Sequence, residues 1–337
     1  MTSAGAVGST GLPIPEPGAG EVRLKVLAAG ICHSDLHVVD RDGMGWPLPF
    51  TFGHEICGRV EAAGEGVGKD LIGTQVVVHA PVGCARCPRC VAGRTNYCDR
   101  RASLPAVGLG LGIDGGMADA VVVDRSRLVP ADGLDPVTAA ALTDAGLTSY
   151  HAVASCTPAL CEPDAVVVVI GVGGLGHMAV GILRAMTRAQ VVAVDTRAEA
   201  LELARACGAH AAARPDTAAA VVAEVSAGRG ADVVLDFVAA QATLDAAVPL
   251  LRAAGELVVV GGGGGTLPVR KPGTLPSGLV VRMPFWGSRD ELVATVELAR
   301  AGVLTAHTTT FALSEAGQAF ARLRRGQVIG RAVLVPD

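Results

Sequence analysis

The sequence is poor in aromatic side chains and in net charge. Only 3% of its residues are Phe, Trp or Tyr, while 50% are hydrophobic, so its cores must be built chiefly from Val, Leu and Ala. The 28 Lys and Arg residues stand against 32 Asp and Glu residues, a formal net charge of −4, and no basic block occurs. The electrostatic footprint of a nucleic-acid binder or of an anionic-membrane binder is therefore lacking, and we expect small-molecule chemistry.

Long hydrophobic segments are also lacking. No run of about 18 apolar residues occurs, which argues against a transmembrane helix. Residues 1–11 have neither the basic start nor the apolar run of a secretory signal peptide, so we expect a cytoplasmic protein. The nine cysteines are an odd number and four of them share one short loop, which in a reducing compartment indicates a metal rather than disulfides.

The length of 337 residues exceeds the size at which a single core usually stops growing, so two domains are expected. The first half carries short strand-like runs between Gly and Pro turns, such as 21–28 and 74–79, and predicts a β-rich domain. From about Pro163, Val-rich runs alternate with Ala-rich helical stretches, which is typical of a parallel βαβ sheet. The predicted strands there are 165–170, 190–194, 232–237 and 256–260, the helices are 174–188, 197–207 and 241–252, and a helix at 289–301 and a strand at 329–335 follow.

The tightest motif is a loop with four thiols, in which two residues separate each of the first three cysteines and seven precede the last. Such spacing lets one loop wrap a tetrahedral metal ion, and a site with four thiolates is closed and therefore structural. An iron–sulfur cluster is a weaker alternative, because the chain shows no second cluster motif. The members of this loop are Cys84, Cys87, Cys90 and Cys98.

A second constellation combines Cys32-His33-Ser34-Asp35 with Gly53-His54-Glu55. A thiolate and an imidazole, each beside a carboxylate, can share one metal ion. Taken singly, Cys32 and His54 are also compatible with ordinary core or surface positions. Next to a loop with four cysteines they indicate a catalytic zinc, which needs three protein ligands and one open position.

A third motif follows the apolar run 165–170. The glycines of a G-x-G-x-x-G pattern end a predicted strand and open a predicted helix, and Asp195 follows after about 20 residues at the end of the next strand, as in the dinucleotide fingerprint. The alternative is a turn that merely packs a helix on a strand. As a fingerprint, it would place pyrophosphate at a helix N-terminus, and Asp195 would accept hydrogen bonds from ribose hydroxyls. The residues of this loop are Gly171, Gly173, Gly174, Leu175 and Gly176.

Taken in order, these motifs resemble the zinc-containing medium-chain alcohol dehydrogenases over nearly the whole chain, from Pro13 to Pro336. The resemblance also includes Trp46-Pro47-Leu48-Pro49, Asp144-Ala-Gly-Leu-Thr148 and Gly330-Arg331. It implies a GroES-like catalytic domain at 1–145 and 283–337, with the structural zinc loop at 84–98, around a Rossmann NAD-binding domain at 146–282. The fold class is therefore expected to be α/β, with a doubly wound parallel sheet beside a β-rich domain.

The resemblance also implies roles for the metal-site residues. In this family Cys32 and His54 would ligate the catalytic zinc, and Asp144 would be the third ligand at a position where many members have Cys. A turn or helix N-cap is the alternative role for Asp144. Glu55 would lie behind the zinc, and Asp35 would orient the His54 ring through its second nitrogen.

Further roles follow from the resemblance position by position. Ser34 and His37 would carry the alcohol proton to solvent. The remaining residues would touch the cofactor: His33 and Arg331 at the pyrophosphate, Thr148, Val260 and Gly261 at the nicotinamide, and Arg197 beside Asp195. For His33 and Arg331 the alternative is a solvated surface charge, and for Val260 it is simple core packing.

The activity implied is hydride transfer between an alcohol and NAD(H), with two zinc ions per chain and a homo-oligomeric state, a dimer or tetramer. The rival activities are a zinc-bearing reductase acting on an activated C=C or C=N bond, and a zinc- and NAD-binding protein without turnover. The substrate cannot be read from the sequence, because Trp46, Phe285 and Trp286 could line an apolar pocket or belong to the core.

Overall fold

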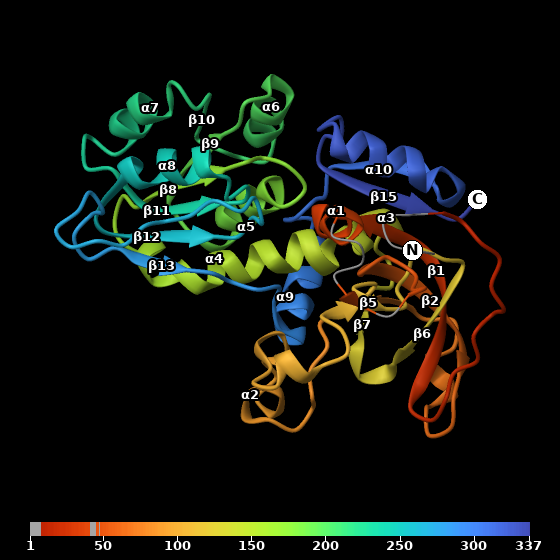
Figure 1. Ribbon diagram of the computed structural model, residues 1–337. Coiled ribbons are helices and arrows are strands. Elements are labelled where there is room, and N and C mark those ends of the chain that lie inside the picture. Colours follow the sequence, from red (N-terminus) through yellow and green to blue (C-terminus); the bar gives the residue numbers. More distant parts are fainter. Residues whose placement is uncertain (1–7, 41–44, 47) are drawn as a thin grey trace. The chain divides into compact units, whose positions relative to one another are not determined.

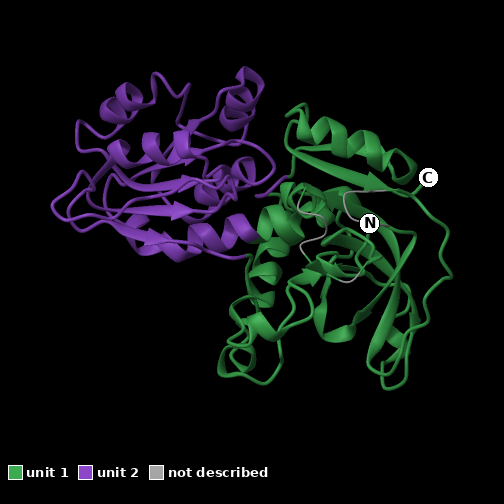
Figure 2. Ribbon diagram, in the orientation of Figure 1, with its two compact units in different colours: residues 1–147, 286–302, 306–337 green, residues 148–285, 303–305 purple. Residues whose placement is uncertain are grey.

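The computed structural model describes residues 8–40, 45–46 and 48–337, which divide into two compact units (Figure 2). The first unit takes its residues from 1–147, 286–302 and 306–337, and the second comprises 148–285 and 303–305. Residues 1–7 and Pro47, which belongs to one of the motifs above, lie outside the described residues.

The first unit is built on a seven-stranded sheet (Figure 1). Its path runs β14-β15-β1-β2-β3-β7, with β6 also paired to β1, and only the pair β14 and β15 is parallel. Side chains of the long strand β1 alternate, so that Val22, Leu24 and Val26 are buried while Lys25 is exposed. The strands are β1 (Glu21–Ile31), β2 (Glu55–Ala63), β3 (Gln75–Val78), β6 (Ala120–Asp124), β7 (Leu128–Pro130), β14 (Thr308–Ala312) and β15 (Arg331–Val335).

Short helices and one small ribbon complete this unit. The clearest local helix signal is at α9, where the Ser288 side chain accepts from the Glu291 amide and the Glu291 side chain accepts from the Ser288 amide, a full capping box. The helices are α1 (His33–Asp40), α2 (Pro88–Val91), α3 (Pro136–Ala141), α9 (Arg289–Arg300) and α10 (Ala316–Arg324), the π-helical turn is η6 (Leu142–Gly146), the 3-10 turns are η2 (Lys69–Leu71), η3 (Thr95–Tyr97), η4 (Arg101–Ser103), η5 (Arg125–Arg127) and η7 (Leu313–Glu315), and the ribbon pairs β4 (Gly108–Leu109) with β5 (Gly112–Ile113).

The second unit contains a six-stranded, wholly parallel sheet of order β10-β9-β8-β11-β12-β13. Numbered from its first strand, this is the order 3-2-1-4-5-6 of a doubly wound dinucleotide-binding fold, so the predicted fold class is confirmed. The strands are β8 (Val166–Ile170), β9 (Gln190–Val194), β10 (Ala211–Ala213), β11 (Ala231–Asp236), β12 (Leu251–Val259) and β13 (Val280–Arg282).

Helices cover both faces of this sheet. Val166, Val168 and Ile170 of β8 pack with α7 and α8 in one cluster, whereas Ala193 of β9 packs with α6 on the opposite face. Burial on both faces explains why these strands are continuous Val-rich runs. The chain reverses its winding between β8 and β11, and ligands bind beyond the carboxyl ends of the strands at such a switch point. The helices are α4 (Leu147–Leu160), α5 (Gly176–Met186), α6 (Ala198–Ala206), α7 (Ala218–Val225) and α8 (Gln241–Leu250).

No helix in the described part of the chain has both the length and the apolar character needed to cross a membrane.

Candidate active site

Four potential metal ligands meet in the first unit. Ligand atoms of Cys32, His54, Glu55 and Asp144 all lie within 4.8 Å of one another, and all four residues are buried. Cys32 follows β1, and His54 and Glu55 stand at the start of β2, which pairs with β1. Asp144 comes from the π-helical turn η6, a rare backbone form that recurs at functional sites. The sequence motifs that were predicted to share one metal are thus brought together.

Asp35 organises two of these residues. One of its carboxylate oxygens accepts from the Cys32 amide at 2.8 Å, and the other lies 3.3 Å from His54 Nδ1. Nε2 of the same ring is left facing the cluster, 3.6 Å from Asp144 Oδ2. Burial acts to lower the pKa of His54, but the nearby carboxylates outweigh it and raise that pKa well above its usual range. The contact with Asp35 holds the ring with Nε2 turned toward the other ligands, as a metal-binding imidazole requires.

The Arg331 side chain enters the same cluster. It is 3% exposed, its Nε donates to Glu55 Oε2 at 2.9 Å, and its second guanidinium nitrogen donates to Asp144 Oδ2 at 2.7 Å and also to the other Glu55 oxygen. The alternative of a solvated surface charge is wrong for this residue. Its contact with a cofactor pyrophosphate stays a prediction. Burial raises the pKa of Glu55 to about 7, although the guanidinium acts to lower it.

Two glycines beside this ion pair, Gly30 and Gly330, lie too close to neighbouring groups to carry a side chain. A Cβ atom at Gly30 would overlap the Glu55 carboxylate, so β1 can pass that side chain only without a side chain of its own. Gly330, which has a φ of +71°, passes so close to the His307 carbonyl that a Cβ there would overlap it. The sequence contains the motif Gly330-Arg331, but no local pattern indicates that its arginine pairs with Glu55 and Asp144.

The residues predicted to move a proton lie on or beside α1. Cys32 Sγ lies 3.5 Å from Ser34 Oγ, so the hydroxyl is next to the predicted zinc ligand. His37 is half-buried one turn further along the helix, and His33 is exposed. The ring of Trp286, which is 5% exposed, meets the His54 ring edge-on with centroids 5.5 Å apart.

The loop with four cysteines folds as a single ligand cage. Its sulfur atoms lie within 4.8 Å of one another. Backbone amides point at them: the Cys87 amide lies 3.3 Å from Cys84 Sγ and the Cys90 amide 3.4 Å from Cys87 Sγ. The amide of Arg86 is the main cause that lowers the pKa of Cys84 to about 6. Amide donors stabilise thiolates, so the donor set fits a metal that binds sulfur.

The glycine motif forms the turn between β8 and α5. Gly171 has a φ of +85°, and a Cβ at Gly176 would overlap the Gly171 carbonyl, so the turn tolerates no side chain at either position. Asp195 ties this turn to the end of β9, because one of its oxygens accepts from the Val172 amide at 2.8 Å and the other from the Arg197 amide at 3.0 Å.

Three more of the predicted cofactor residues, Thr148, Val260 and Gly261, belong to the second unit. Thr148 is buried near the start of α4. The amides of Val260 and Gly261, which follow β12, both donate to the carbonyl oxygen of Asp236. Val260 is half-buried and thus not a closed core residue.

Comparison with known proteins agrees with this architecture. The family models of the alcohol dehydrogenase GroES-like domain and of the zinc-binding dehydrogenase match residues 18–133 and 174–301. An NAD-dependent alcohol dehydrogenase of Sulfurisphaera tokodaii is 35% identical, with 96% of this chain and 95% of the relative covered. The crystal structure of the alcohol dehydrogenase from Aeropyrum pernix has a TM-score of 0.89 and 34% identity, with coverages of 98% and 96%.

A second solved structure, acetophenone reductase from Geotrichum candidum in complex with NAD, has a TM-score of 0.82 and 30% identity and covers 96% of this chain and 92% of that one. Near-full-length identity above 30%, two matching family models and two sites with zinc-type donors lead to one conclusion. This chain belongs to the zinc-dependent, NAD(H)-linked medium-chain alcohol dehydrogenases, which interconvert alcohols with aldehydes or ketones.

Proposed function

We propose that Cys32, His54 and Asp144 hold the catalytic zinc and that Glu55 stays outside its first coordination shell. The observation that carries this proposal is the convergence of the four buried ligand groups within 4.8 Å. Glu55 is the member paired on both oxygens to Arg331, so it is the one least free to bind a metal. Zinc held by these three ligands would keep an open position and would polarise an alcohol or carbonyl oxygen there.

The charges of the site support the same assignment. The carboxyl groups of Glu55 and Asp144 are both buried in this cluster, and both pair with the Arg331 guanidinium. A divalent metal bound to Cys32, His54 and Asp144 would add positive charge beside these groups, in a buried place where an unpaired anion is costly. The donor set of one sulfur, one imidazole nitrogen and one carboxylate oxygen is suited to zinc.

In the proton path, the Ser34 hydroxyl would take the proton of the substrate alcohol and pass its own proton through the nicotinamide ribose hydroxyls to His37, which would release it to solvent. The hydroxyl lies 3.5 Å from Cys32 Sγ, a proposed zinc ligand, and this distance supports its role beside the substrate oxygen. A half-buried imidazole one turn along α1 can exchange protons with water.

For the cofactor, the second unit would act as the NAD-binding domain and the first as the catalytic domain. The turn Gly171–Gly176 would hold the pyrophosphate at the N-terminus of α5, with Asp195 at the adenosine ribose. His33, Thr148, Arg197, Val260, Gly261 and Arg331 are the further proposed cofactor contacts. Asp195→Ala should weaken NADH binding in a fluorescence titration and narrow the preference for NAD over NADP in kcat/KM, and unchanged NADH affinity would remove Asp195 from the site.

The four-cysteine loop would carry a structural zinc, and a second copy of the chain would cover the edge strand β13. Val280 and Val281 of this strand are 38% and 43% exposed and Met283 beyond it is 76% exposed, an apolar sheet edge that natural proteins rarely leave uncovered. Pairing of two such edges supports a homo-oligomer.

All nine cysteines are free, which fits the reducing conditions of a cytoplasmic protein.

The experiment that tests the function is a steady-state panel with NAD and NADH. Primary, secondary and aromatic alcohols should be oxidised and the matching carbonyl compounds reduced, with zinc content near two equivalents per chain. Turnover of enones or imines in the absence of any alcohol oxidation would favour the C=C or C=N reductase, and tight NADH binding without turnover of either class would favour a binding protein.

A further inference from the structure

A buried carboxylate in the second unit has no place in the roles assigned so far. Asp236, the last residue of β11, is 0% exposed. One of its oxygens accepts from the amides of Val238 and Ala239, each at 2.9 Å, and the other accepts from the Thr243 hydroxyl at 2.7 Å. The carboxylate therefore fixes the path of the loop that connects β11 to α8.

This loop lies at the switch point of the sheet. Asp236 is the register partner of Ile170, the last residue of β8, so the loops that follow the two strands are neighbours. A Cβ atom at Gly171 would lie 2.5 Å from a methyl carbon of Val238, which means that the Val238 side chain rests on the glycine turn. Val238 is nevertheless 38% exposed, so it also presents an apolar surface outward, where a doubly wound sheet binds its ligand.

Asp236 also holds a second loop through its main chain. The carbonyl oxygen of Asp236 accepts from the amides of Val260 and Gly261, at 2.9 and 3.1 Å. The amides of Gly263 and Gly265 donate in turn to the carbonyls of Val238 and Ala239, at 3.0 and 2.9 Å. A Cβ on any of these three glycines would come closer than 3.0 Å to the backbone of the Asp236 loop, so the two loops form one tightly packed backbone layer.

We propose that Asp236 is a positioning residue for the dinucleotide: its carboxylate preorganises the Val238–Ala240 loop, so that this loop and the glycine segment beyond β12 form a rigid rim of the cofactor site. Ala239 needs this support, since its φ of +55° is unfavourable for a residue with a side chain. The inference rests on the proposed cofactor site at Gly171–Gly176, and it goes beyond that site by naming the group that shapes its second half. Without the carboxylate, the ordering of the loop would be completed only when the cofactor binds.

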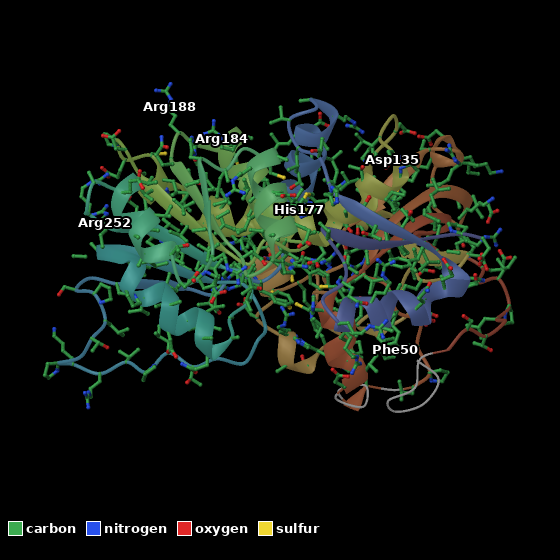
Figure 3. The ribbon with its side chains drawn as sticks, turned by 90° about the horizontal axis from the view of Figure 1, so that it is seen from above. Phe50, Asp135, His177, Arg184, Arg188 and Arg252 are labelled. Carbon is green, nitrogen blue, oxygen red and sulfur yellow. The ribbon has the colours of Figure 1, made fainter. Side chains whose placement is uncertain are left out.

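The same strand offers a matched control. Asp232 is 2% exposed, and its carboxylate accepts from the Val166 amide at 2.7 Å and from Arg252 Nε at 2.5 Å. It stands near the amino end of β11, whereas Asp236 stands at the carboxyl end. Figure 3 labels Arg252 and His177 far apart within the second unit, with Arg252 beside Asp232 and His177 directly after the glycine turn. Loss of Asp232 removes a buried carboxylate of similar kind away from the proposed cofactor site.

The test compares Asp236→Ala with Asp232→Ala by NADH fluorescence titration at a temperature where circular dichroism shows both variants folded. Both should lose thermal stability, but only Asp236→Ala should weaken NADH binding, by roughly tenfold or more, with a higher KM for NAD and a smaller change in kcat. Equal NADH affinity in Asp236→Ala and wild type, or equal weakening in both variants, would overturn the proposal.

Two milder variants keep the proposal testable if Asp236→Ala does not fold. Asp236→Asn should stay within about threefold of wild-type NADH affinity, because its oxygen can still accept from the two amides and its NH2 group can donate to the Thr243 hydroxyl. Thr243→Val should weaken NADH binding, and Thr243→Ser should bind NADH as wild type does. Identical NADH affinities of wild type, Thr243→Val and Thr243→Ser would refute the proposed role of the Asp236 carboxylate. Asp195→Ala separates this failure from that of the cofactor site, since unchanged affinity in that variant would challenge the site itself.

Discussion

Replacement of Arg331 by Met gives a quantitative test of the metal centre. The substitution keeps an unbranched side chain but removes the guanidinium that pairs with Glu55 and Asp144. Removing one partner of a buried ion pair typically costs about 3–5 kcal/mol, because the remaining charge stays buried without compensation. Here two carboxylates lose their guanidinium and keep only the more distant His54 ring, so the metal-free protein should show an effect of this size.

The size of the effect can be converted into a melting temperature. The first unit draws on 1–147, 286–302 and 306–337. A folding unit of roughly 200 residues loses about 2–4 °C in Tm for each kcal/mol. Metal-free Arg331→Met should therefore melt roughly 6–20 °C below metal-free wild type. With zinc bound, the metal supplies positive charge to the same carboxylates, and the difference should shrink to less than half.

The assay is thermal unfolding of both proteins with zinc and after chelation. Comparison of the variant with wild type under the same condition cancels the contribution of the four-cysteine loop. Arg331→Lys should fall between the two, since it keeps the charge but not the planar fork that reaches both carboxylates. If metal-free Arg331→Met melts within about 2 °C of wild type, or if zinc leaves the difference unchanged, the charge balance described for this site is incorrect.

Asp144→Ala should lose one of two zinc equivalents and nearly all activity while NADH binding survives, and Asp144→Cys should retain the metal; full activity of the alanine variant would remove Asp144 from the site. Cys90→Ser should lose the other zinc and lower Tm more than it alters turnover, and a variant that keeps both zinc ions would contradict the cage. Ser34→Ala should slow alcohol oxidation on the order of 10²-fold. His37→Gln should slow it less, and added imidazole buffer should restore part of the rate. A rate of His37→Gln that does not depend on buffer concentration would contradict the role of His37 in the proton path. Burial lowers the pKa of His79 from 6.5 to about 4, so the unfolded chain binds a proton at this residue more readily than the folded chain does. The contribution of His79 to the free energy of unfolding should therefore be full above pH 6.5 and should fall by about 3 kcal/mol as the pH drops to 4. His79→Gln should make Tm depend less on pH between pH 4 and 6.5, and an unchanged curve of Tm against pH would show that His79 does not cause this dependence.

Local patterns predicted the first strand, turn and helix of the second unit well, whereas the helix predicted at 241–252 ends at Leu250 and the strand predicted at 256–260 begins at Leu251. The Val-rich run before Gly171 and the glycine spacing identified β8, the turn and α5 to within two residues, because a strand buried on both faces and a helix opened by glycines are written in neighbouring positions. The four-cysteine loop was equally readable for the same reason. The spacing of its ligands reflects the local geometry of a single metal.

Long-range contacts could not be predicted in the same way. Glu55 and Arg331 are far apart in the sequence, and only the pairing of β1 with both β2 and β15 brings them together. In the sequence, Asp236 is one of several acidic residues near a strand end, and no local pattern predicts the three donors that its carboxylate binds. The π-helical form of η6 also had no sequence signal, because it depends on how the segment between α3 and α4 packs.

The order in which this metal site is synthesised follows from the discontinuous first unit. Cys32, His54 and Asp144 precede the whole second unit, whereas Arg331 follows it. At about 5–20 residues per second, the chain between Asp144 and Arg331 takes roughly 10–40 s to make on a ribosome. During that interval, β1 lacks its partner β15, and the carboxylates of Glu55 and Asp144 lack their guanidinium. A nascent chain that captures zinc in this window would gain the balancing charge before its own cation exists, so zinc supply during translation should affect the yield of folded protein.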